Sequence, residues 1–353
     1  MSTTRAPPNN IVYFHYHASP YARRVAWYLA FRRIAYAECI QPPIMPRPDL
    51  AALGVHYRRT PTMAIGRDVY LDSRAIIARL EQLFPPSTEH PAFSTAEMMG
   101  LAKLLEKFVV DASLFVHATT IMPPDLPVFK DEKFLKDRAG FFGGKGMKEG
   151  IKERRGAGLV HVRQCFDVVE NLVGDGREWV GGGDRVTLAD LEGKESGEEC
   201  FDGDAYSRVG VWCIDWILRD LSPPKEYFSE EIYPKTYAWR ARFMAELEGA
   251  KSQAPKPVRL QGPDAVKAVL NADFSNKRIE VDAADPIHIA AGTNVELYPT
   301  DSGGQMHRDR GRLIKLTKDE VAIAVQSQDG STEVHIHAPR WNFKIAELSG
   351  SKL

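Results

Sequence analysis

The sequence predicts a multi-domain protein with an α/β domain, an all-helical domain and a small β-barrel-like domain, in that order. In residues 9–88, short apolar runs typical of strands alternate with segments in which apolar residues recur every three or four positions. A capping-box pattern then opens a long amphipathic segment in residues 93–250. Five short alternating runs separated by turn residues follow in residues 256–353. We expect the domain boundaries where these patterns change.

Composition narrows the class of protein. The chain has 353 residues, of which 44% are hydrophobic and 26% charged, as in ordinary globular proteins. The net charge of −1 favours neither nucleic acid nor an anionic membrane surface as a partner. The four cysteines lie far apart, in neither a metal-ligand spacing nor a disulfide framework. No run approaches the ~20 apolar residues of a membrane span, so we expect a cytoplasmic protein with no membrane partner.

The stretch Ser19-Pro20-Tyr21-Ala22 joins a predicted strand, residues 11–16, to a predicted helix. Serine is a preferred N-cap residue, and proline fits the first helical turn because its missing N–H would be unpaired there. The backbone donors at such a helix start favour a bound anion. Thioredoxin-like folds present their C-P-x-C site in the same way, with Ser19 and Ala22 here at the two cysteine positions. Disulfide exchange at this site is therefore excluded, while the anion-binding geometry remains.

Two further motifs follow this stretch. Thr60-Pro61 precedes the third predicted strand, and a trans proline at a strand start would be the ordinary interpretation. Asp72-Ser73 precedes a helix predicted over 74–84. Ser73 suits the N-cap position, which stabilises a helix in any protein. A hydroxyl and first-turn N–H groups at that place can also hold an anion.

Together these motifs make residues 11–84 similar to the thioredoxin-fold N-terminal domain of a glutathione transferase with serine at the active position. The carrying segments are Ser19–Val25, Thr60–Thr62, Leu71–Ser73 and Ala75–Ile76.

The resemblance implies a role for each of five residues. Ser19 would donate a hydrogen bond to the sulfur of glutathione. Pro61 would be cis, so that the backbone of Thr60 pairs with the bound peptide. Ser73 would hold the γ-glutamyl carboxylate, while Asp72 attracts the α-ammonium group.

Three neighbours of Ser19 are further candidates. Tyr21 carries the alternative hydroxyl, although the family alignment puts it two positions past the active residue. Arg23 and Arg24 would add positive field at the thiolate. The competing interpretation makes both arginines solvent-facing or inter-domain residues, which is the commoner situation for surface cations.

Two histidine pairs raise the question of a metal. His15 and His17 lie at the end of the first strand, with no carboxylate or cysteine nearby in sequence to complete a ligand set. His335 and His337 alternate with apolar residues, so we expect them on the solvent face of a strand. We therefore predict no metal site.

The helical segment carries a second resemblance. Thr187 and Asp190 form a capping box similar to the buried one in the C-terminal domain of glutathione transferases. Residues 193–208 then interrupt the helical pattern with a polar, glycine-bearing stretch. We interpret this stretch as an insertion loop or a retained intron. Sequencing the transcript would distinguish the two.

The resemblance implies an enzyme that activates the glutathione thiol for attack on a small electrophile, with glutathione as co-substrate. Such enzymes act in detoxification, and a homodimer is possible. The helical domain would supply an apolar pocket for the electrophile. Residues 256–353 lie outside the family pattern. Two alternatives stay open: a non-catalytic regulatory or assembly protein with this fold, and a glutathione-dependent isomerase.

Overall fold

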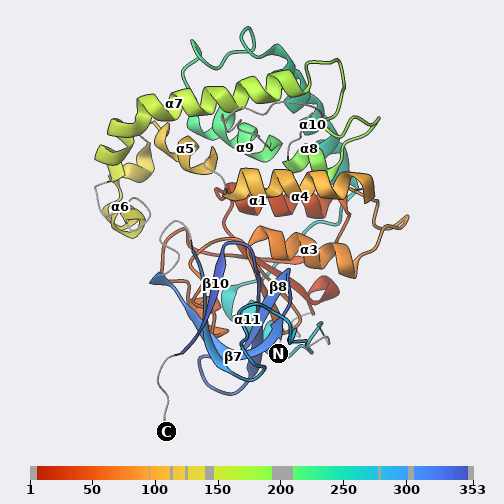
Figure 1. The fold of residues 1–353 in the computed structure, drawn as a ribbon, viewed down its shortest axis with the longest axis vertical. Helices are drawn as coiled ribbons and strands as arrows, with labels where there is room; N and C mark the ends of the chain where they lie inside the picture. Colours follow the sequence, from red (N-terminus) through yellow and green to blue (C-terminus); the bar gives the residue numbers. More distant parts are fainter. Residues whose placement is uncertain are drawn as a thin grey trace. The chain divides into compact units, whose positions relative to one another are not determined.

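The computed structural model describes residues 6–94, 96–111, 114–123, 126–139, 147–192, 210–276, 280–300 and 306–348. The predicted insertion at 193–208 lies outside them. The chain divides into two compact units (Figure 1). The sheet unit comprises Met1–Ala26, Ile34–Pro85 and Pro255–Leu353, and the helical unit comprises Trp27–Arg33 and Pro86–Ala254. The three-domain division into 9–88, 93–250 and 256–353 stays a prediction about which segments fold independently.

The described part of the sheet unit contains one ten-stranded sheet with the order β10-β6-β7-β8-β9-β4-β3-β1-β2-β5. The strands are β1 (Ile11–His15), β2 (Ala37–Ile40), β3 (Thr62–Ile65), β4 (Asp68–Leu71), β5 (Val258–Arg259), β6 (Asn294–Pro299), β7 (Asp309–Leu316), β8 (Glu320–Gln326), β9 (Glu333–Pro339) and β10 (Phe343–Glu347).

The first part of this sheet has the predicted thioredoxin-like topology. Strand β1 pairs with β2 in parallel and with β3 antiparallel, and β3 pairs antiparallel with β4. A parallel pair needs a crossover connection, which helix α1 (Pro20–Phe31) supplies between β1 and β2. Helix α2 (Pro48–Ala52) precedes β3, and helix α3 (Ser73–Leu83) follows β4 directly.

The C-terminal strands differ from the predicted small barrel, because their sheet is not closed. All five predicted strands are present and pair antiparallel in the order β10-β6-β7-β8-β9. The last of them, β9, then pairs in parallel with β4. On the opposite edge, β5 pairs with β2. An unpaired strand edge is a liability, and the C-terminal segment covers both edges of the thioredoxin-like sheet.

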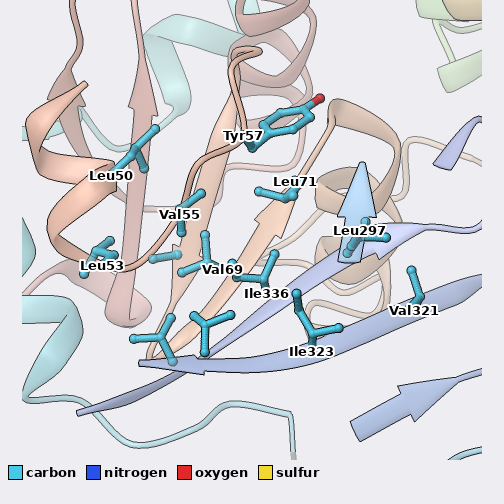
Figure 2. Close-up of a cluster of buried hydrophobic side chains, with 14 of the residues drawn as sticks. Leu50, Leu53, Val55, Tyr57, Val69, Leu71, Leu297, Val321, Ile323 and Ile336 are labelled. Atoms are coloured by element: carbon cyan, nitrogen blue, oxygen red, sulfur yellow. The ribbon is translucent and has the colours of Figure 1, made fainter. Parts of the chain in front are cut away.

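One apolar cluster runs through both parts of the sheet. Val69 and Leu71 of β4 belong to it together with Ile336 of β9 and Ile323 of β8 (Figure 2). Ala265 and Val269 from helix α11 (Gly262–Leu270), together with Leu50 of α2, join the same cluster. The C-terminal strands therefore share their core with the thioredoxin-like strands.

The helical unit contains α4 (Ala96–Asp111), α5 (Leu114–Thr120), η2 (Pro127–Lys130), α6 (Glu132–Ala139), α7 (Met147–Leu172), α8 (Leu188–Glu192), α9 (Val211–Trp216), the π-helical turn η4 (Ile217–Leu221) and α10 (Pro234–Gln253). The predicted capping interaction is present, since the Asp190 carboxylate accepts hydrogen bonds from the N–H (2.9 Å) and hydroxyl (3.0 Å) of Thr187. The indole N–H of Trp239 also donates to Asp190, at 3.2 Å. Among the helices that the structure describes, we find none long and apolar enough to cross a membrane.

His335 and His337 are buried, so the predicted solvent-facing position of these residues is wrong. The ring of Phe274 stacks on His335 at a centroid distance of 3.8 Å, and Tyr70 stacks on His337 at 4.5 Å. Alternation along a strand shows which residues share a face. It does not show whether another segment covers that face, and here residues from distant parts of the chain do so.

We predict that Ile336→Ala lowers the free energy of unfolding by about 2–5 kcal/mol, the usual cost of truncating a fully buried isoleucine. Ile336 lies opposite both Val69 of β4 and Ile323 of β8. The cavity should therefore destabilise the thioredoxin-like strands along with the C-terminal ones. Thermal and urea unfolding of the full chain measure the effect. The control is Ile287→Ala, at a side chain that is 41% exposed, with an expected change within about 0.5 kcal/mol. Equal effects of the two substitutions would contradict a shared core.

Candidate glutathione site at one end of the sheet

Strand register brings three loops to the same end of the sheet. Phe14, near the end of β1, lies opposite Thr62, the first residue of β3. Thr62 in turn lies opposite Leu71, the last residue of β4. The residues that follow β1, precede β3 and follow β4 therefore emerge at one end. These loops carry the residues predicted for the site: Ser19, Thr60, Pro61, Asp72 and Ser73.

Ser19 caps helix α1, as the sequence predicted. Its Oγ accepts a hydrogen bond from the N–H of Ala22 at 3.2 Å, and its carbonyl accepts from the N–H of Arg23 at 3.0 Å. The side chain is buried. A hydroxyl that accepts one bond still has its own proton to donate. Ser19 can therefore act as a donor while it caps the helix.

The Thr60–Pro61 peptide bond is cis, as the resemblance implied. Thr60 is half-buried, whereas Pro61 is buried and directly precedes β3.

Asp72, and not Ser73 as predicted, is the N-cap residue of α3. The Asp72 carboxylate accepts the N–H of Arg74 at 2.9 Å, and two nitrogens of the Arg74 guanidinium donate to its two oxygens at 2.9 Å each. A short acidic side chain satisfies the first-turn donor from one position earlier, so Ser73 becomes the first helical residue. Burial alone would raise the pKa of Asp72, but the charge and hydrogen bonds of Arg74 hold it below the ordinary value.

Arg24 belongs to the same corner. Its Nη1 donates to Oγ of Ser73 at 2.6 Å, and both side chains are buried. The interpretation of Arg24 as a solvent-facing residue is therefore wrong. A guanidinium, a hydroxyl and the start of an eleven-residue helix meet at Ser73, which is a combination that favours an anion.

The remaining two candidates, Tyr21 and Arg23, are half-buried. Tyr13, on β1, is buried and donates its hydroxyl to the carbonyl of Ala22 at 2.8 Å. This hydrogen bond links β1 to α1. Burial raises the pKa of Tyr13 well above its ordinary value, so its phenol is not an activated hydroxyl. His15 pairs with Glu38 at 3.2 Å, in keeping with a structural role.

Comparison with known proteins identifies the fold. Residues 14–88 match the family model of the glutathione S-transferase N-terminal domain. The crystal structure of a GST-like protein from Pseudomonas syringae superposes with a TM-score of 0.63 at 22% identity, covering 96% of this chain and 99% of that one. The protein has a glutathione transferase fold. The high coverage shows that this solved fold also extends through the C-terminal strands.

Other matches are weaker. A glutathione S-transferase from Rhodospirillum rubrum gives a TM-score of 0.42 at 18% identity, covering 78% of this chain and 98% of that one. A glutathione S-transferase from Methylobacillus flagellatus, solved with glutathione bound, gives a TM-score of 0.39 at 17% identity, covering 70% of this chain and 100% of that one. Residues 117–195 and 205–252 match a domain of unknown function. A search of curated protein sequences found no match.

We predict that Asp72→Asn destabilises the glutathione transferase fold by up to about 3–5 kcal/mol at neutral pH, because the buried Arg74 loses the charge of Asp72. Since the folded pKa of Asp72 is lowered, its contribution is complete above the unfolded value of about 3.9 and is lost as the pH falls below it. The stability gap between wild type and Asp72→Asn should therefore narrow below about pH 4. Urea unfolding between pH 7 and pH 3 measures this gap.

The control for this experiment is Asp319→Asn, which removes an exposed pair with Lys318 and should cost at most about 1 kcal/mol. A pH-independent gap for Asp72→Asn, or a loss no larger than in this control, would contradict the role given to the Asp72–Arg74 pair.

Proposed function

We propose that this protein is a glutathione transferase, which binds glutathione at the end of the sheet where the three loops emerge and activates its thiol for attack on a small electrophile. The observation that carries the proposal is the pairing of two buried hydroxyls with helix starts at the same end of the sheet: Ser19 at α1 and Ser73 at α3. The Ser19 hydroxyl would donate to the sulfur of glutathione, and the Ser73 hydroxyl would donate to its γ-glutamyl carboxylate.

The γ-glutamyl end would bind at the corner of Arg24 and Ser73. Its carboxylate accepts from the Ser73 hydroxyl and from first-turn N–H groups of α3, with the Arg24 guanidinium adding charge. Asp72 attracts the α-ammonium group. Although Arg74 donates three hydrogen bonds to the Asp72 carboxylate, a carboxylate has about four acceptor positions, so one remains for the ammonium group.

The thiol end would lie at Ser19. A free thiol has a pKa of about 8.5, and a helix N-terminus lowers it by stabilising the thiolate. The Ser19 hydroxyl donates to the sulfur, and the thiol proton passes to solvent. The thiolate then forms a bond to the electrophilic carbon, and any leaving group departs with the bonding electron pair. The backbone of Thr60 would pair with the backbone of the bound peptide.

Three further properties belong to this proposal. We propose a cytoplasmic enzyme, in keeping with the free cysteines Cys39, Cys165 and Cys213. We propose a homodimer, which sedimentation of the purified chain would test. Detoxification is the proposed role, and a panel of electrophiles would test it.

We predict that Ser19→Ala raises the pKa of bound glutathione by about one unit and lowers the conjugation rate near pH 7 by about tenfold, because the thiolate loses a donor. Affinity for glutathione should change by less than about threefold, since the γ-glutamyl corner remains. The pH–rate profile, together with calorimetric titration of glutathione, separates the two effects.

The matched variant is Ser73→Ala, which should lower the affinity for glutathione and leave the thiol pKa unchanged. Loss of a hydrogen bond to a charged group costs about 1.5–3 kcal/mol, so affinity should fall by at least about tenfold while the thiol pKa stays the same. If Ser19→Ala leaves the pH–rate profile unchanged, the activating hydroxyl is elsewhere, and Tyr21 is the first alternative. If the wild type binds glutathione without ionising it, the protein is a non-catalytic member of this fold.

A further inference from the structure

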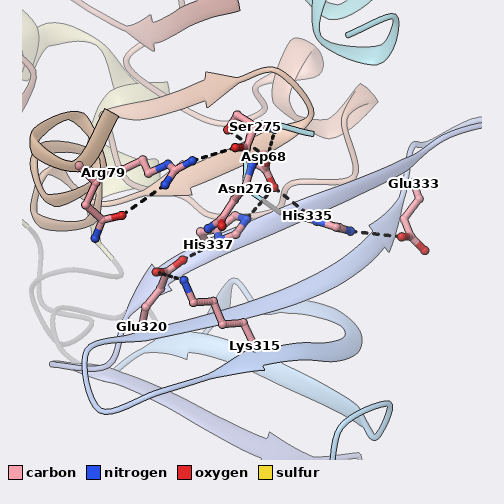
Figure 3. A network of polar contacts seen from close by, with 10 residues as sticks. Asp68, Arg79, Ser275, Asn276, Lys315, Glu320, Glu333, His335 and His337 are labelled. Atoms are coloured by element: carbon pink, nitrogen blue, oxygen red, sulfur yellow. Dashed lines mark hydrogen bonds and ion pairs between the residues drawn. The ribbon is translucent and has the colours of Figure 1, made fainter. Parts of the chain in front are cut away.

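A second cluster of titratable side chains lies where β4 pairs with β9, away from the candidate glutathione site. The parallel register places Asp68 opposite His335 and Tyr70 opposite His337. Oδ1 of Asp68 lies 2.9 Å from Nε2 of His337 and 3.3 Å from Nδ1 of His335 (Figure 3). One ligand atom from each of the three residues lies within 4.8 Å of the others. All three side chains are buried.

These separations suit a metal ion. Zinc is bound by nitrogen and oxygen at about 2.0–2.1 Å, usually in tetrahedral geometry, which puts neighbouring ligand atoms about 3.3 Å apart. Two separations in the cluster, 2.9 and 3.3 Å from Oδ1 of Asp68 to the two ring nitrogens, are close to that value.

The outer nitrogen of each ring is held by a carboxylate. Nδ1 of His337 lies 2.6 Å from Oε1 of Glu320, and Nε2 of His335 lies 3.2 Å from Oε1 of Glu333. A histidine that binds a metal almost always donates its other ring N–H to a carboxylate, a carbonyl or water. Both histidines therefore have the partner that directs the remaining nitrogen inward.

The Asp68 carboxylate is oriented in the same way. Its Oδ2 accepts the backbone N–H of Ser275 at 2.6 Å and that of Asn276 at 2.8 Å. The Ser275 hydroxyl lies 3.1 Å from the same oxygen. Oδ1 is thereby left facing the two rings.

We propose that Asp68, His335 and His337 bind one divalent transition-metal ion, with Zn²⁺ as the best-suited candidate. Imidazole nitrogens with one carboxylate are typical zinc ligands, and three protein ligands leave a fourth position open. A pocket of about 280 Å³, lined in part by Phe274, Glu333 and His335, borders the cluster on the side of His335. The bound ion would fasten β9 to β4. This proposal is independent of the glutathione site.

The test uses the full-length chain without a polyhistidine tag, stripped with a chelator and kept free of glutathione, which itself binds zinc. Calorimetric titration with Zn²⁺ should give one ion per chain with a Kd in the micromolar range or below. The melting temperature should rise with the Zn²⁺ concentration, because the ion binds the folded state. Co²⁺ should bind with the visible absorption of a low-coordinate nitrogen–oxygen site.

His337→Gln removes one ligand at similar volume and should weaken Zn²⁺ binding by at least about a hundredfold. The matched control is His288→Asn, at an exposed histidine with positive φ that asparagine tolerates, and it should bind like the wild type. Absence of binding by the wild type, or undiminished binding by His337→Gln, overturns the proposal. If His337→Gln does not fold, the wild-type stoichiometry and Co²⁺ spectrum decide alone.

Discussion

The carboxylate of Asp68 has no exposed surface, and its contacts link β4 to β9 and to residues 275–276. Burial of an unpaired carboxylate is too costly to be stable, so partners must come from elsewhere in the chain. Burial would raise the pKa of Asp68, but hydrogen bonds from His335 and His337 hold it well below the ordinary value. His337 is 269 positions away from Asp68 in sequence. The thioredoxin-like strands therefore depend on the C-terminal strands for the partners of this carboxylate as well as for a shared apolar core.

Strand β4 links the buried carboxylate of Asp68 to the candidate site. Asp68 stands at its start, and Asp72 and Ser73 follow its end. At about 3.3 Å per residue, the four positions from Asp68 to Asp72 span roughly 13 Å. The pairing of β4 with β9 on one side and β3 on the other holds the strand that leads into the proposed γ-glutamyl site. The C-terminal segment thus supports the position of the site without contributing the residues predicted for it.

Local signals in the sequence predicted the parts of this structure that depend on neighbouring residues. Ser19 before Pro20 indicated a capped helix start, and the Thr187–Asp190 spacing indicated a buried capping box. Arg24 could not be placed in this way, because its partner Ser73 is 49 positions away and helical spacing does not reveal it. The burial of His335 and His337 was missed for the same physical reason. Their alternation with apolar residues is local, while the strand and loop that cover them are distant in sequence.

A crystal structure of the chain with glutathione would show whether the three loops form the binding site. We expect the γ-glutamyl carboxylate to contact Oγ of Ser73 and the first-turn N–H groups of α3. We also expect the sulfur within hydrogen-bonding distance of Oγ of Ser19 and the backbone of Thr60 paired with the peptide. Glutathione bound away from this end of the sheet, or with its sulfur directed away from Ser19, would contradict the proposed site.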